Sequence, residues 1–284
     1  MAEPILKWAG GKRQITNEIL CHFPLDYRNR GYHEPMVGAG ALTFLIEPKK
    51  GSINDINERL MRLYRAIRDH PDELVSQNQK HVHDRDHYYA ARKRFNSPLS
   101  GEKLDEIEEA SLMIYLNRTC WNGLYRVNSK GEFNVPLGSY KDPDFVQEER
   151  IRKANKILKR LKILSGDFNY VLKEAKKGDI VYFDPPYQPI SATSAFTSYS
   201  KEGFDFNEQT RLRDTMIRLN KKGILVILSN SDAPKLIELY EELESYHITK
   251  ILARRAINCN GSKRGKVGEI IVSNVPQEIK GIRF

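Results

Sequence analysis

The stretch IVYFDPPY, residues 180–187, decides how the rest of the chain is interpreted. Its β-branched and aromatic residues at 180–183 predict a buried strand. The two prolines that follow can neither extend a helix nor donate ladder hydrogen bonds, so the backbone must leave the sheet there. Asp184, Pro185 and Tyr187 are therefore placed together at the C-terminal end of a strand, where open α/β sheets bind ligands. Such a site suits a flat base held by its exocyclic amine.

Strands and helices alternate on both sides of this stretch. Further strands are predicted at 51–55, 161–164 and 224–228, and helices at 14–23, 169–177, 207–222 and 234–243. This alternation predicts an α/β fold with a mostly parallel sheet. A closing pair of strands at 248–252 and 270–272 predicts an antiparallel edge.

The segment 57–161 interrupts the alternation with apolar residues at helical spacing. Within it, residues 125–135 predict a β-hairpin, because Gly131 supplies the positive φ that a short loop with a bulge needs. We therefore expect one domain from residues 1–56 and 162–284, and a helical insertion carrying a hairpin at 57–161.

A glycine turn at Gly38 and Gly40 follows a predicted strand and precedes a helix, which is typical of nucleotide sites. Thr43 stands where a dinucleotide fingerprint needs its last glycine, so no pyrophosphate cradle is expected. With Asp55 at the end of the next strand, the turn still fits an adenosyl ribose. The alternative is that both glycines only shape a tight turn.

The composition of the chain limits the classes of partner, location and metal site that are expected. The 284 residues carry a formal charge of +9, which favours a polyanion, although charge alone leaves nucleic-acid binding open. Three well-separated cysteines predict neither a disulfide framework nor a zinc site, and hence a reducing cytoplasmic location. We expect no membrane span and no signal peptide. The histidines at 81, 83 and 87 lack the acids or cysteines that complete a metal site, so no metal is expected.

Four stretches taken together resemble a known family. KWAGGK at 7–12, PMVGAG at 35–40, Asn54-Asp55 and the DPPY at 184–187 are similar to the motifs of Dam-type (alpha-class, D12) DNA adenine-N6 methyltransferases, and they come in the same order. WNGLYRVN at 121–128 and GEFNVP at 131–136 resemble the DNA-reading hairpin of that family. The resemblance runs from about residue 5 to 272 and departs at Met36, where the family usually has Phe.

This resemblance implies a Rossmann-like, S-adenosylmethionine-dependent methyltransferase sheet, with residues 57–161 as the target recognition domain. The expected activity is methyl transfer to N6 of an adenine flipped out of double-stranded DNA, with GATC as the target, in a restriction–modification system. Asp184 and the Pro185 carbonyl would accept hydrogen bonds from the amine, and Tyr187 would stack on the base.

The expected cofactor residues are Trp8, Lys12, Gly38, Gly40, Asp55, Asp167, Phe168 and Asp184. For Asp167 and Phe168 the alternative is a helix N-cap and a core side chain. The expected DNA-binding residues are Lys7, Leu124, Arg126, Asn128, Pro136 and Tyr140. Arg126 can read a guanine edge through two parallel hydrogen bonds, or it can form a surface salt bridge.

Three other functions stay open. An N4-cytosine methyltransferase could use the same acid–proline pair, a non-catalytic DNA-binding protein could retain the fold, and an RNA-modifying enzyme could retain the chemistry. The polar and aromatic stretch 188–203 is expected to be a lid over the site. The sequence leaves the oligomeric state open, with a monomer slightly favoured.

Overall fold

The computed structural model describes residues 2–8, 10, 12, 15–186, 204–254 and 266–280. The chain forms two compact units. Unit 1 comprises Met1–Gly11, Gly38–Glu47 and Asp55–Gly166, and unit 2 comprises Lys12–Val37, Pro48–Asn54 and Asp167–Phe284. The predicted recognition segment 57–161 thus lies in unit 1, and Asp184 lies in unit 2. Within the described ranges, no helix is long and apolar enough to cross a bilayer.

A seven-stranded sheet has the order β3-β2-β1-β4-β5-β7-β6. Strands β2, β1, β4 and β5 are parallel neighbours, whereas β7 is antiparallel to both β5 and β6. The predicted Rossmann-like α/β sheet with an antiparallel edge is confirmed. The strands are β1 (Tyr32–Glu34), β2 (Gly51–Asp55), β3 (Lys162–Ser165), β4 (Ile180–Phe183), β5 (Leu225–Ser231), β6 (His247–Arg254) and β7 (Lys266–Ser273).

Strand β4 is central and buried along its whole length. It pairs with β1 on one side and with β5 on the other, where Phe183 is opposite Leu228. A parallel strand with neighbours on both edges and helices against the sheet needs apolar residues at every position, which explains the uninterrupted IVYF. Because β1, β4 and β5 are parallel, their carboxyl ends meet at one edge of the sheet, where Asp184 follows β4.

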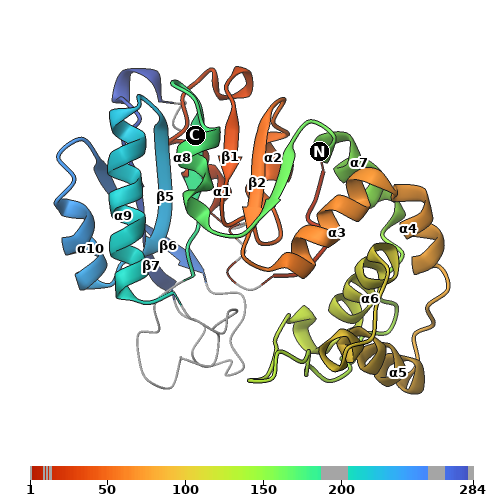
Figure 1. Cartoon of the computed structure of the whole chain (residues 1–284). Coiled ribbons are helices and arrows are strands. Elements are labelled where there is room, and N and C mark those ends of the chain that lie inside the picture. The colour runs from red at the N-terminus through yellow and green to blue at the C-terminus, as the bar shows by residue number, and fades with distance from the viewer. Residues whose placement is uncertain are drawn as a thin grey trace. The chain divides into compact units, whose positions relative to one another are not determined.

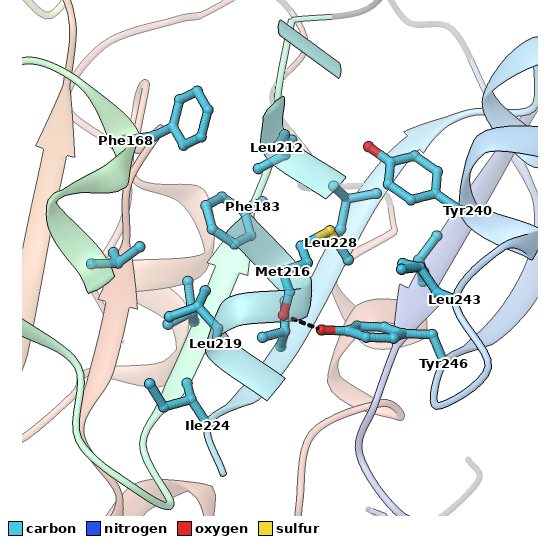
Figure 2. Close-up of a cluster of buried hydrophobic side chains, with 14 of the residues drawn as sticks. Phe168, Phe183, Leu212, Met216, Leu219, Ile224, Leu228, Tyr240, Leu243 and Tyr246 are labelled. Atoms are coloured by element: carbon cyan, nitrogen blue, oxygen red, sulfur yellow. Dashed lines mark hydrogen bonds between the residues drawn. The ribbon is translucent and has the colours of Figure 1, made fainter. Parts of the chain in front are cut away.

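The core of unit 2 lies between this sheet and helix α9 (Figure 2). Leu212, Met216 and Leu219 of α9 are spaced to share one helix face, and all three are buried. The hydroxyl of Tyr246 donates a hydrogen bond to the carbonyl of Met216 at 2.8 Å, which satisfies a buried phenol. Figure 1 shows α9 along β5, with α10 beside it. The helices of unit 2 are α1 (Thr16–Leu20), α8 (Val171–Glu174), α9 (Phe206–Lys221), α10 (Pro234–Glu241) and the 3₁₀ turns η1 (Tyr27–Asn29), η4 (Phe168–Tyr170) and η7 (Gln277–Ile279).

Unit 1 is mainly helical, as Figure 1 shows for α3 to α7. Helix α6 is buried on most sides and packs against α3, α4 and α5. It even buries Glu109, whose carboxylate accepts hydrogen bonds from Arg59 and Arg62, as a buried charge requires. The elements are α2 (Ala41–Ile46), α3 (Glu58–Asp69), α4 (Pro71–Asn78), α5 (Arg85–Asn96), α6 (Glu106–Thr119), α7 (Glu148–Leu158), η2 (Ser97–Ser100) and η3 (Trp121–Gly123).

The predicted hairpin is present in unit 1. Val127 and Phe133 form an antiparallel bridge, and Asn128 N donates to Glu132 O at 2.9 Å. Gly131 has a φ of +82°, the left-handed conformation that the turn requires. The hairpin is anchored to α5, because both polar groups of the Asn96 side chain hydrogen bond to the backbone of Phe133.

Candidate active site

The carboxylate of Asp184 lies directly after β4 and is 23% exposed. The ammonium of Lys12 lies 3.1 Å from its Oδ1, and Ser229 Oγ donates to the same oxygen at 3.2 Å. Both contacts use Oδ1. Within the described part of the chain, Oδ2 is therefore the oxygen that can accept a hydrogen bond from a substrate amine.

The charge state of Asp184 depends on its surroundings. Burial raises the pKa of this carboxyl above its ordinary value, the Lys12 ammonium lowers it, and the Glu269 carboxylate raises it further. The hydrogen bond from Ser229 also lowers this pKa, so Lys12 and Ser229 favour the ionised, hydrogen-bond-accepting form. Tyr182 contributes indirectly, since its hydroxyl lies 2.8 Å from Ser229 Oγ and helps to orient that side chain.

The glycine turn of unit 1 holds a second carboxylate. Gly38 N donates to Asp55 Oδ2 at 3.0 Å, and Asn57 N donates to Oδ1 at 3.0 Å. Burial raises the pKa of Asp55, while the backbone N–H bonds from Asn57, Gly38 and Ile56 lower it. Each carboxylate oxygen has two lone pairs, so both oxygens can still accept from a ligand hydroxyl.

An aromatic ring lies against this turn. A Cβ atom on Gly38 would come within 3.0 Å of Trp8 Cδ1, and Gly38 has a φ of +49°. Any larger residue would therefore collide with the indole and strain the backbone. Trp8 itself stacks on Tyr125, with ring centroids 5.1 Å apart and an interplanar angle of 20°. Gly38, Asp55 and Trp8 are thus brought together within unit 1.

These residues fit the adenosyl methyl donor that the sequence predicts. Asp55 offers acceptors of the kind that ribose hydroxyls need, and Trp8 offers an apolar face beside a turn with no side chain. Gly40, the second glycine, has a φ of +70° at the N-cap of α2, with the Phe44 and Tyr64 side chains beside it.

Asp167 and Phe168 make the contacts that a helix N-cap and a core side chain would make. Asp167 accepts a hydrogen bond from Asn169 N and forms two more with Arg211, at 3.0 and 2.7 Å. Phe168 is buried in the core of unit 2, and the Arg211 guanidinium lies over its ring. Their role toward a cofactor stays a prediction.

The predicted DNA-reading residues lie on and around the hairpin. Arg126 is exposed, and its Nε donates to Asn134 Oδ1 at 2.8 Å, which leaves the two terminal amino groups for a base edge. Pro136 is exposed and Leu124 half-buried. Asn128 stabilises the hairpin turn, since its Oδ1 accepts from the backbone of Lys130 and Glu132, and a base contact by this residue stays a prediction.

Lys7 lies beside Tyr140. The Lys7 ammonium donates to the Tyr140 hydroxyl at 3.0 Å. The buried Asn117 bonds both backbone groups of Lys7 and the carbonyl of Gly123, so it ties the KWAGGK stretch to the loop before the hairpin. Lys7 and Tyr140, two predicted DNA-binding residues that are distant in the sequence, therefore lie close together in unit 1.

Three contacts were not foreseen from the sequence. Ser229 and Glu269 join the Lys12–Asp184 pair through long-range strand pairing, and Tyr125 meets Trp8 across more than a hundred residues. A polar residue inside an apolar strand was the one signal available for Glu269. Tyr187 and the stretch 188–203 lie outside the described residues.

The histidines at 81 and 87 contact each other and neighbouring side chains. His81 Nδ1 lies 2.9 Å from His87 Nε2, and His81 Nε2 lies 3.0 Å from Ser111 Oγ. His81 also stacks on Tyr115. Within the described ranges, no three histidines, cysteines or acids are grouped so that they could hold a metal ion.

Known proteins match the chain along nearly its whole length. A sequence model of a family described as D12 class N6 adenine-specific DNA methyltransferase matches residues 8–257. The type II methyltransferase M1.LlaDCHI of Lactococcus lactis subsp. cremoris is 44% identical over 277 residues, covering 95% of each chain. The type II methyltransferase M.MjaIII of Methanocaldococcus jannaschii is 39% identical, covering 96% of this chain and 99% of its own. A DNA adenine methylase of Salmonella typhi is 34% identical, covering 95% of each chain.

Proposed function

The chain belongs to the D12 class of N6 adenine-specific DNA methyltransferases, and on that premise we propose that it methylates adenine in GATC sites of double-stranded DNA as part of a restriction–modification system. Its methyl donor is S-adenosylmethionine, and its substrate is DNA. The observation that best supports the proposed chemistry is the geometry of Asp184, which uses one oxygen for Lys12 and Ser229 and leaves the other for the base.

The amine at N6 of adenine is a weak nucleophile, because its lone pair is delocalised into the ring. S-adenosylmethionine, when bound, supplies an electrophilic methyl group on a sulfonium. Asp184 Oδ2 accepts a hydrogen bond from one N6–H, and the Pro185 carbonyl accepts from the other. The two acceptors localise the lone pair toward the methyl group and stabilise the positive charge that develops on nitrogen. Tyr187 stacks on the flipped base.

The proposed cofactor roles are assigned residue by residue. Asp55 accepts from the ribose hydroxyls, and Gly38 and Gly40 allow close approach of the turn. Trp8 packs near the methionine end, where Lys12 contributes its ammonium. Asp167 and Phe168 hold the adenine ring of the cofactor, with the carboxylate of Asp167 accepting from its amine.

DNA recognition uses residues 57–161, with residues 1–56 and 162–284 as the catalytic domain. Arg126 donates to a guanine edge through its two terminal amino groups, and Leu124 and Pro136 contact a thymine methyl. Lys7 contacts the first guanine and Tyr140 a phosphate, while Asn128 acts through the hairpin turn. Two of the relatives are named type II methyltransferases, which supports the restriction–modification role.

Plasmid DNA lacking adenine methylation tests this function directly. After incubation with the protein and S-adenosylmethionine, we expect resistance to endonucleases that GATC methylation blocks and cleavage by those that require it. Mass spectrometry of the digested nucleosides should detect N6-methyladenine. N4-methylcytosine without N6-methyladenine would contradict the base assignment, and N6-methyladenine without protection at GATC would contradict the target sequence alone.

A further inference from the structure

A second acid, Glu269, shares the ammonium of Lys12 with Asp184. Lys12 Nζ lies 3.1 Å from Asp184 Oδ1 and 3.6 Å from Glu269 Oε2. Lys12 is 6% exposed and Glu269 8% exposed, so these two charges interact with little screening by water, while the Asp184 side chain is 23% exposed. The site thus contains one buried cation between two carboxylates.

Strand pairing places a hydroxyl beside Glu269. Ser231 of β5 is the register partner of Glu269 on β7, and directly opposed residues of an antiparallel pair point to the same face of the sheet. Ser231 is 2% exposed. Ser231 Oγ and Glu269 Oε2 are both buried without a hydrogen-bond partner within the described part of the chain. A hydroxyl and a carboxylate oxygen left this way indicate a place where a polar or charged ligand is expected.

The formal charges of this cluster do not cancel. Lys12 contributes one positive charge, and Asp184 and Glu269 contribute two negative charges, so the cluster carries one net negative charge. A buried net charge is costly, and a ligand of opposite charge offsets that cost. Asp232, which follows Ser231 along the chain, is exposed and therefore screened by water.

The methyl donor and its product differ by one charge at the reacting atom. S-adenosylmethionine carries a sulfonium, whereas S-adenosylhomocysteine has a neutral thioether in its place. We propose that Glu269 is a positioning residue that holds Lys12 against Asp184 and gives the site the net negative charge that favours the cationic donor over the neutral product. This inference rests on the proposed function of Asp184. It adds Glu269 as a positioning residue and a preference of the site for the donor over the product.

Binding measurements without DNA test the inference apart from turnover. Titration calorimetry gives the ratio of the dissociation constant of S-adenosylhomocysteine to that of S-adenosylmethionine. Replacing Glu269→Gln keeps the shape of the side chain and removes its charge, so we expect this ratio to fall by about tenfold. Glu269→Asp keeps the charge and should keep the wild-type ratio.

The matched control is Glu278→Gln, which removes an equal charge from an exposed position of η7 in the same unit. It should leave the ratio unchanged. An unchanged ratio in Glu269→Gln would overturn the inference, and an equal loss of affinity for both ligands would then indicate a structural role. If Glu269→Gln does not fold, a tenfold lower ratio in folded Glu269→Asp would overturn it, and the wild-type ratio there would support it. Failure of the proposed function is distinguishable, because the wild-type protein would then bind the donor without methylating adenine in DNA.

Discussion

Lys12 Nζ and Ser229 Oγ both contact Oδ1 of Asp184, from 3.1 and 3.2 Å, so the carboxylate is oriented by one of its two oxygens. A carboxylate fixed in this way presents Oδ2 in one direction without further reorganisation, which is the property that electrostatic catalysis requires. The arrangement also makes Asp184 dependent on a cation from a sequence-distant stretch, and its function can therefore be tested from either partner.

Replacing Asp184→Asn should abolish most methyl transfer while DNA binding stays near that of the wild type. The amide nitrogen donates instead of accepting, so the lone pair of N6 is no longer localised. We expect single-turnover rates to fall by about 100-fold or more. Radiolabelled methyl transfer and a gel-shift titration measure the two properties separately. Residual turnover within tenfold of the wild type would refute the catalytic role.

The pH dependence of methyl transfer should respond to Lys12. Burial raises the pKa of Asp184 and Lys12 lowers it, so Lys12→Met should raise it further. Since the reaction uses the ionised carboxylate, activity is lost as pH falls through this pKa, and the acid limb of the rate profile should move to higher pH in the variant. The exposed Lys153 gives the control Lys153→Met, which should keep the wild-type limb.

The alternation of strands and helices was predictable from the sequence. The end of β4 was predictable too, because a run of four apolar residues stopped by two prolines has few structural solutions. Strand β2 was predicted with its observed bounds, and β4 likewise. The helix predicted at 169–177 is instead a 3₁₀ turn, η4, followed by the short α8. Its backbone becomes extended at Ala175, ahead of Gly178 with a φ of +83°.

The candidate functional residues of each unit were predictable only where they lie in motifs. Asp184, Lys12, Trp8 and Asp55 each belong to a short stretch with its own signal. Ser229 joins Asp184 through the parallel pairing of β4 and β5, and Glu269 is brought in by the antiparallel pairing of β5 and β7; sequence periodicity registers neither pairing. The contact between Asp167 and Arg211 could not be predicted from the sequence either, since Arg211 comes from a helix more than forty residues further along the chain.

The stack of Trp8 on Tyr125 predicts an indirect role for Tyr125 in cofactor binding. Tyr125→Leu removes the ring that holds the indole against Gly38, so we expect S-adenosylmethionine to bind about 3- to 10-fold more weakly, as loss of an aromatic pair implies. Tyr125→Phe retains the ring and serves as the matched control. Calorimetric titration checks both variants, and equal affinities for Leu and Phe would contradict the role.

Stability should fall on acidification through His81. Burial, and then the neighbouring His87, lower the pKa of His81 from 6.5 to about 4. The unfolded chain therefore takes up a proton at a higher pH than the folded protein does, and the free energy of unfolding decreases as pH falls from about 6.5 toward 4, by about 3 kcal/mol in full. Urea denaturation at pH 7.5 and 5.5 should show a smaller decrease for His81→Gln than for the wild type. An identical decrease in both would contradict this assignment.

Replacing Arg126→Ala should relax recognition of one base pair. The guanidinium lies exposed on the hairpin with Nε bonded to Asn134, and its terminal amino groups can form the bidentate pair that reads guanine. We expect a loss of about 1–3 kcal/mol on the intact site and a smaller loss on sites altered at that base pair. Competition between oligonucleotides that carry each single substitution measures the change. Arg152→Ala is the control, because Arg152 is exposed on α7 and pairs with Asp72 and Glu148. A uniform loss on every sequence, with a weaker dependence on salt, would identify Arg126 as a phosphate contact instead.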